Sequence, residues 1–154
     1  MTAPVEVRAP LDGTVVALAD VPDPVFSGQV VGPGVAVEPA AGGEQTVVAP
    51  ADGRVATLFP HAFALETPDG RTVLVHLGID TVRLGGEGFS VRVAVGDAVR
   101  AGDPLLTWRP DDVAAAGFAT VCPVVALEAV PGAVVTVPPT GTRVQAGDPL
   151  LSWS

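Results

Sequence analysis

The chain has 154 residues, of which 48% are hydrophobic and 16% charged, so it holds enough apolar material for one core and shows no composition typical of disorder. Seventeen acidic residues against eight basic ones give a net charge of −9, which argues against binding to nucleic acid or to an anionic membrane surface. All eight basic residues are arginines. Since biotin and lipoyl carrier domains need an acceptor lysine, this class of β domain is excluded.

The first ten residues lack a basic cluster followed by an apolar run, and no apolar run approaches the roughly 18 residues that cross a bilayer. We therefore expect a soluble, cytoplasmic chain without a signal peptide or membrane insertion, with residues 1–154 forming one domain. The single cysteine, Cys122, cannot form an internal disulfide, and its apolar neighbours Val121 and Val124 predict a buried thiol.

Short valine-rich segments, separated by 18 glycines and 16 prolines, are typical of an antiparallel domain with many strands. One helix is predicted at 110–116, where Pro110 suits the first turn and Asp111 and Asp112 suit the positive helix end. The fold class is therefore all-β, an antiparallel sandwich or barrel with one short helical segment. In chain order, the predicted strands are 5–9, 13–17, 34–38, 46–49, 53–58, 62–67, 72–79, 90–94, 104–108, 122–127, 133–137 and 149–153.

Two segments of the chain recur. APLDGTV at 9–15 returns as APADGRV at 49–55, and AGDPLLTW at 101–108 returns as AGDPLLSW at 146–153. The spacings of the two repeats differ, whereas an open solenoid needs at least three repeats of constant period. We expect repeated turn and strand units inside one closed fold.

Only two histidines are present, His61 and His76. Alternation along 72–80 places His76 on the face opposite the apolar residues expected in the core. Gly78 lies on the face of His76 and leaves room for another group to approach the imidazole. A hairpin through 68–70 would bring the two rings within reach of each other.

His61 is expected to begin a strand in which Phe63 and Leu65 share its orientation. From the residues alone, three interpretations of the two histidines stay open. They are two structural histidines, two ligands of a zinc ion with a carboxylate such as Asp80, or a nucleophilic imidazole steadied by the other. At cytoplasmic pH most of an unperturbed imidazole is neutral and nucleophilic.

The sequence around His76 resembles one known family. VHLGIDTV at 75–82, followed by LGGEGF at 84–89, is similar to the active-site signature of the glucose-type enzyme IIA of bacterial sugar phosphotransferase systems. Further matching segments follow the family order over nearly the whole chain. They are APLDG at 9–13, DVPDPVF at 20–26, VGPG at 31–34, APADG at 49–53, HAF at 61–63 and GDAV at 96–99.

The resemblance implies a phosphocarrier with a β sandwich or barrel and no cofactor. His76 matches the histidine that accepts a phosphoryl group on Nε2 from the phosphocarrier protein HPr and donates it to the cysteine of a IIB domain. His61 matches the partner that hydrogen-bonds the phosphoryl group. Asp23 and Asp80 match acidic positions at the rim of the site. The apolar collar that docks partners maps onto Val25, Phe26, Val30, Val31, Phe59, Phe63, Leu74 and Val82.

The chain departs from the family pattern at one point near His61. Its members often carry a longer stretch with a threonine before the His-Ala-Phe element, where this chain has only Phe59, Pro60 and His61, so Thr57, Thr81 or a backbone carbonyl must hold the His76 ring. No resident metal is expected, and zinc at the two histidines would be adventitious or belong to an interface. A zinc endopeptidase needs more ligands than these two. The sugar is not encoded, and a regulatory role through phosphorylation is compatible with the carrier role.

Overall fold

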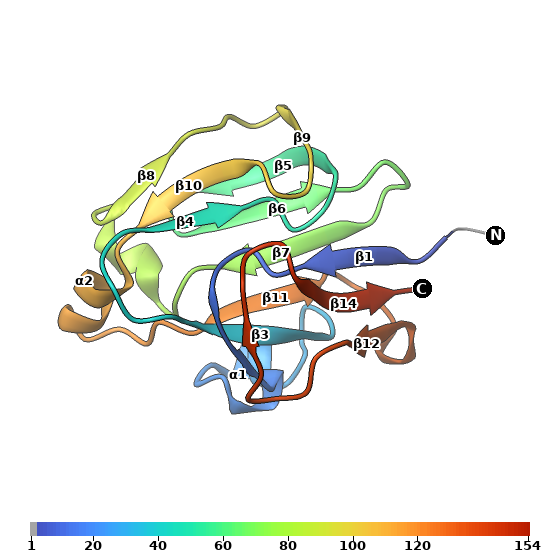
Figure 1. Ribbon diagram of the computed structural model, residues 1–154, viewed down its shortest axis with the longest axis horizontal. Helices are drawn as coiled ribbons and strands as arrows, with labels where there is room; N and C mark the ends of the chain where they lie inside the picture. Colours follow the sequence, from blue (N-terminus) through green and yellow to red (C-terminus); the bar gives the residue numbers. More distant parts are fainter. Residues whose placement is uncertain (1–2) are drawn as a thin grey trace.

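The computed structural model describes residues 3–154 (Figure 1). Its two α-helices are α1 (Pro24–Ser27) and α2 (Pro110–Ala115), and its three 3-10 helices are η1 (Leu18–Asp20), η2 (Thr81–Leu84) and η3 (Pro131–Ala133). The strands are β1 (Val5–Arg8), β2 (Gly13–Val16), β3 (Gly34–Pro39), β4 (Gln45–Val48), β5 (Gly53–Phe59), β6 (Ala62–Glu66), β7 (Thr72–His76), β8 (Phe89–Val91), β9 (Ala98–Val99), β10 (Pro104–Trp108), β11 (Cys122–Ala126), β12 (Val134–Thr136), β13 (Arg143–Val144) and β14 (Pro149–Trp153).

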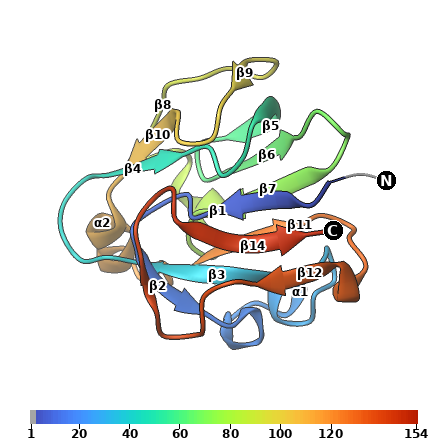
Figure 2. The same cartoon turned by 45° about the vertical axis from the view of Figure 1, so that its right-hand side comes forward.

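The strands form three sheets, and every strand pair is antiparallel. The large sheet has eight strands in the order β13-β2-β3-β11-β7-β6-β5-β9, and the two small sheets have the orders β1-β14-β12 and β4-β10-β8. In Figures 1 and 2 the small sheets lie over one face of the large sheet. Fully buried residues from all three sheets, such as Trp108, Phe63 and Leu151, fill one core between them. The predicted all-β antiparallel class is therefore confirmed.

The large sheet is symmetric about its centre, between β11 and β7. From the two edges inward, β13 corresponds to β9, β2 to β5, β3 to β6 and β11 to β7. The two sequence repeats explain this symmetry. Arg8 N–H donates to Pro50 O and Val48 N–H donates to Pro10 O, both at 2.8 Å, so the repeated turns bond reciprocally. The molecule thus consists of two similar halves, with 45–108 inserted between β3 and β11 of the other half.

The predicted helix at 110–116 and the twelve predicted strands are present with small changes at their ends, but some short elements were missed. Strand β7 ends at His76 rather than at residue 79, because Gly78 and Asp80 have positive φ angles of 74° and 61°. Helix α1 was not predicted. Its cap is the carboxylate of Asp23, which accepts from Val25 N–H at 2.9 Å, and Pro24 occupies the first turn.

A second, smaller apolar cluster lies on the outer face of the large sheet. Phe26, Leu18 and Val21, from the segment around η1 and α1, pack there against Val125 and Ile79. The segment between β2 and β3 therefore covers this part of the sheet, and helix α1 lies beside β3 in Figure 1. This packing brings α1 to the end of β7, where His76 lies.

Cys122 has none of its surface exposed, as predicted, and its Sγ lies 3.2 Å from Thr120 O. Burial raises the pKa of its thiol well above the ordinary value, which makes it unreactive. Among residues 3–154, no helix is both long and apolar enough to span a membrane.

The close approach of β3 to β11 gives a test of the fold. At Gly34, a Cβ atom would lie 2.1 Å from Val124 O and 2.9 Å from Val125 Cα, both in the backbone of β11. We expect Gly34→Ala to lower the free energy of unfolding by at least about 1–3 kcal/mol, because the two strands must move apart. Gly43→Ala is the matched control, since nothing lies within 4 Å of its Cβ position. Urea denaturation measures both variants, and equal stabilities would contradict the expectation.

Candidate functional site

The two histidines meet at the end of the β5–β6–β7 meander. The turn at Pro60 and His61 connects β5 to β6, and β6 pairs with β7 so that Ala62 lies opposite His76. Leu77 N–H donates to His61 O at 2.7 Å, which ties the two histidine segments together. The imidazole centroids are 5.2 Å apart with planes at 66°, so the expected meeting of the two rings is present.

The expected orientation of His61 was wrong. His61 lies in the turn rather than in strand β6, so its ring does not follow Phe63 and Leu65 into the core. It lies instead between His76 and Phe59, whose ring stacks on it with a centroid distance of 5.8 Å. The turn breaks the alternation on which the prediction depended.

The ring of His76 is held by a backbone carbonyl. Its Nδ1 lies 2.5 Å from Gly78 O. A carbonyl can only accept a hydrogen bond, so Nδ1 carries the proton and Nε2 keeps its lone pair. Of the three groups expected to replace the family threonine, the carbonyl is therefore the one in contact, while Thr57 is exposed and Thr81 donates to Leu77 O.

The carbonyl of Gly78 reaches His76 because the chain turns sharply there. Gly78 has a φ angle of 74°, a region that side chains other than glycine rarely adopt. Ile79 N–H donates to Ala119 O at 3.0 Å and fixes the turn from the other side. The contribution of Ala119 was missed, because a backbone acceptor gives no signal in the sequence.

The environment lowers the pKa of both imidazoles. Burial lowers the pKa of His76, against the hydrogen bond to Gly78 O and the negative charges of Asp23 and Asp80, which raise it. Burial also lowers the pKa of His61, and the neighbouring His76 lowers it further. Both rings are therefore neutral at neutral pH, and the Nε2 atom of His76 is a free nucleophile.

Two aromatic members of the expected collar are buried. Phe26 is only 7% exposed, because it belongs to the outer-face cluster, and its ring centroid lies 5.4 Å from that of His76. It forms a wall of the site rather than a docking surface. Phe63 is 1% exposed, pairs with Val75 and belongs to the main core. Its assignment to the collar was wrong, because it points to the opposite face of the sheet from His76.

The remaining apolar positions of the expected collar differ in their exposure. Leu74 and Val31 are half-buried against the outer-face cluster. Four large side chains are exposed: Val25 to 43%, Val30 to 72%, Phe59 to 54% and Val82 to 61%. We call these four the exposed rim. They come from three separate segments of the chain, and exposed large apolar side chains are candidates for contact with a partner.

The acidic positions lie where their charges act on His76. Asp23 is half-buried and caps α1, while Asp80 is exposed in the loop after β7. Two imidazoles and two carboxylates near one another suggest metal binding, but no cluster of three or more metal-binding side chains occurs within residues 3–154.

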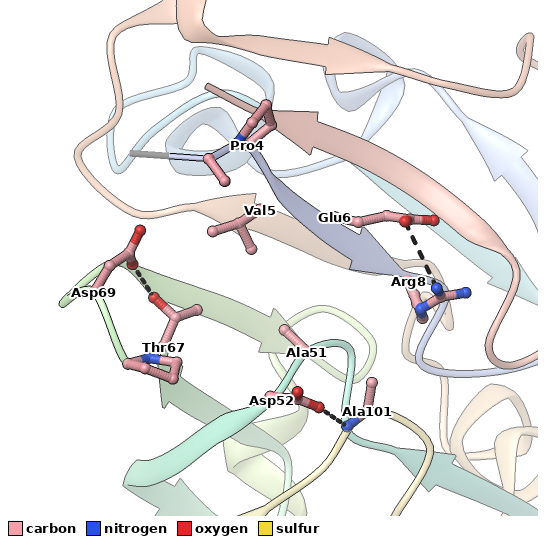
Figure 3. Close-up of a pocket in the computed structure, with 11 residues that line it drawn as sticks. Pro4, Val5, Glu6, Arg8, Ala51, Asp52, Thr67, Asp69 and Ala101 are labelled. Carbon is pink, nitrogen blue, oxygen red and sulfur yellow. Dashed lines mark hydrogen bonds and ion pairs between the residues drawn. The ribbon is translucent and has the colours of Figure 1, made fainter. Parts of the chain in front are cut away.

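The molecule has a groove away from the two histidines. A groove of about 570 Å³ runs between β1 and the turn at 67–69, and Figure 3 shows Asp52 and Thr67 on its wall. Neither histidine lines this groove. This groove is therefore separate from the histidine pair.

The acidic neighbours of His76 give a test by titration. We expect Asp23→Asn and Asp80→Asn each to lower the pKa of His76, because each variant removes a negative charge that favours the imidazolium form. Two-dimensional NMR of the histidine side chains across pH 4.5–8.5 measures the shift. Asp111→Asn, in the first turn of α2, is the control and leaves the pKa unchanged. An unchanged or higher pKa of His76 in the Asp23→Asn or the Asp80→Asn variant would contradict the expectation.

Comparisons with known proteins agree with this geometry. Residues 5–130 match the family described as phosphoenolpyruvate-dependent sugar phosphotransferase system, EIIA 1. The chain is 46% identical over 123 residues to the PTS system glucose-specific EIIBCA component of Corynebacterium glutamicum, a match that covers 79% of the chain and only 18% of that protein. It is 40% identical over 119 residues to the glucose-specific EIIA component of Bacillus cereus, which covers 76% of the chain and 70% of that protein.

A solved structure is similar over its full length. The glucose permease IIA from Mycoplasma capricolum superposes with a TM-score of 0.87 at 33% identity, covering 98% of this chain and 96% of that one. The fold, the family match and the relatives all lead to one assignment. The chain belongs to the EIIA 1 family of the phosphoenolpyruvate-dependent sugar phosphotransferase system.

Proposed function

We propose that this chain is a phosphocarrier in sugar uptake, which accepts a phosphoryl group from phosphorylated HPr on His76 and passes it to the cysteine of a IIB domain. The observation that carries the proposal is the contact between His76 Nδ1 and Gly78 O, which leaves Nε2 with its lone pair. The corynebacterial relative is named as a joined EIIBCA protein, which supports a IIB acceptor. The choice of sugar then belongs to the partner components.

In the transfer, His76 Nε2 attacks the phosphorus of the donor phosphohistidine. A new P–N bond forms to Nε2 while the donor P–N bond breaks, and that electron pair returns to the donor imidazole. The His76 ring then carries substituents on both nitrogens and gains positive charge. Gly78 O, Asp23 and Asp80, which favour a protonated His76, stabilise this charge in the same way.

His61 serves as the partner of the phosphoryl group. Its ring lies 5.2 Å from that of His76, so an N–H of His61 can donate to a phosphoryl oxygen placed on Nε2. The lowered pKa of His61 rises again once that group is present, because a neighbouring dianion favours imidazolium. The second histidine thus becomes a stronger donor when the phosphoryl group arrives.

The exposed rim supplies the docking surface. Its valines and Phe59 exclude water from the transfer without fixed polar pairing, so one surface suits both a donor and an acceptor protein. We place the relay in the cytoplasm and assign residues 1–154 to one carrier domain. The pairing of β1 with β14 supports a single domain, since the first and last strands share one sheet.

Replacing the nucleophile tests the carrier role. Mixed with phosphoenolpyruvate, enzyme I and HPr, the wild-type chain is expected to incorporate acid-labile, base-stable phosphate, while His76→Gln incorporates none. His61→Gln keeps the nucleophile, and we expect it to accept phosphate about tenfold more slowly, because one donor to the phosphoryl oxygens is lost. Phosphate incorporation and circular dichroism are measured together. Full incorporation by a folded His76→Gln variant would refute the assignment.

A charge on the rim tests the docking role. Val82 and Val95 are both 61% exposed, but Val82 belongs to the rim and Val95 lies in the loop before β9. We expect Val82→Asp to raise the apparent KM for phosphorylated HPr about tenfold, since a carboxylate must be desolvated on docking. Val95→Asp adds the same charge and leaves the KM within about twofold. Equal effects of the two variants would contradict a docking role for the rim.

A further inference from the structure

The loop after β7 determines where the acceptor for His76 Nδ1 lies. Resting on the carrier role proposed above, we propose that Thr81 is a positioning residue for phosphoryl acceptance. Its buried hydroxyl fixes the Leu77 carbonyl, and this holds the next residue, Gly78, where its own carbonyl keeps His76 in the tautomer with a nucleophilic Nε2. Thr81 touches neither histidine in this role and acts through the backbone.

The hydroxyl of Thr81 connects the two ends of this loop. Thr81 is 0% exposed, and its Oγ1 donates to Leu77 O at 2.7 Å. No main-chain N–H in the described residues 3–154 donates to this carbonyl, so the threonine is its donor. On its other side, Leu77 donates its own N–H to His61 O. Leu77 is therefore held between the His61 turn and Thr81.

The methyl group of Thr81 has a separate contact. A Cβ atom at Gly78 would lie 2.7 Å from Thr81 Cγ2 and 2.8 Å from Ala119 O. Gly78 thus fits in a slot between the threonine methyl group and the Ala119 carbonyl. Because the two branches of the side chain act on different atoms, serine retains the hydroxyl contact and valine retains only the packing contact.

Loss of the hydroxyl reaches His76 in two steps. The Leu77 carbonyl loses its donor in a place without solvent, so the loop shifts to satisfy it. Gly78 O then no longer holds Nδ1, and the ring populates the tautomer that has the proton on Nε2. This tautomer has no lone pair at the reacting nitrogen. The charged groups that act on His76 are Asp23 and the titrating His61, which lie outside this loop, and Asp80, which belongs to it.

The experiment compares the wild-type chain with Thr81→Val, Thr81→Ala, Thr81→Ser and Thr107→Val. Thr107 is also buried, at 3% exposed, but it lies in β10 and so controls for a loss of stability alone. Nitrogen-15 NMR of the histidine side chains reports the tautomer and the pKa of His76. Phosphate transfer from HPr reports the rate.

We expect Thr81→Val and Thr81→Ala to move the His76 nitrogen shifts toward an average of two tautomers. The pKa of His76 falls in both variants, because the bond to Gly78 O raises it in the wild type. Phosphoryl acceptance slows by about tenfold or more, since a displaced nucleophile loses the in-line geometry. Thr81→Ser and Thr107→Val keep the wild-type tautomer and pKa, and they accept phosphate within about twofold of the wild-type rate.

A folded Thr81→Val or Thr81→Ala chain with a single Nδ1–H tautomer and the wild-type pKa would overturn the proposal, whatever its rate. So would a Thr81→Ser chain that loses the tautomer while keeping the hydroxyl. The NMR measurements need no phosphoryl donor. A wild-type chain that takes no phosphate therefore contradicts the proposed function, while the spectra still decide the role of Thr81.

Discussion

The hydrogen bond between His76 Nδ1 and Gly78 O is the interaction on which the site depends. Without this bond the imidazole can carry its proton on either nitrogen, and only the tautomer with the proton on Nδ1 has a nucleophilic Nε2. The fold provides this bond by ending β7 at His76 and turning the chain at once through a glycine. A strand continued to residue 79 would direct the Gly78 carbonyl into the sheet ladder instead.

The pKa of the acceptor reflects opposing forces. Burial disfavours the charged ring and keeps it a nucleophile, while Gly78 O, Asp23 and Asp80 favour charge and so stabilise the ring once it is phosphorylated. A site with burial alone would bind the phosphoryl group poorly, and a site with strong carboxylate contacts would hold a protonated, unreactive imidazole. A carrier needs the intermediate case, because it must both receive and release the group.

Much of this could be predicted from the sequence. Glycine and proline spacing marked the strands, and the resemblance of the HLGID segment to a known family predicted His76 as the acceptor, with Asp80 as its acidic neighbour. The exposure of two phenylalanines was wrongly predicted, because tertiary contacts that the local sequence does not show bury them. Phe26 has the sequence context of an exposed loop residue, but it is buried because the η1 and α1 segment packs on the sheet. Phe63 was assigned to the collar by the resemblance, but it pairs with Val75 and its side chain lies in the main core.

The two halves of the molecule share a scaffold but not a function. The position in β11 that corresponds to the last residue of β7 is held by Ala126, and the short turn that carries His61 corresponds to the long segment between β2 and β3. One half thus carries both histidines, and the longer connection of the other half packs Phe26 against the ring of His76. The environment of the reactive ring is therefore built from both halves, so a substitution in the connection between β2 and β3 also changes the surroundings of His76.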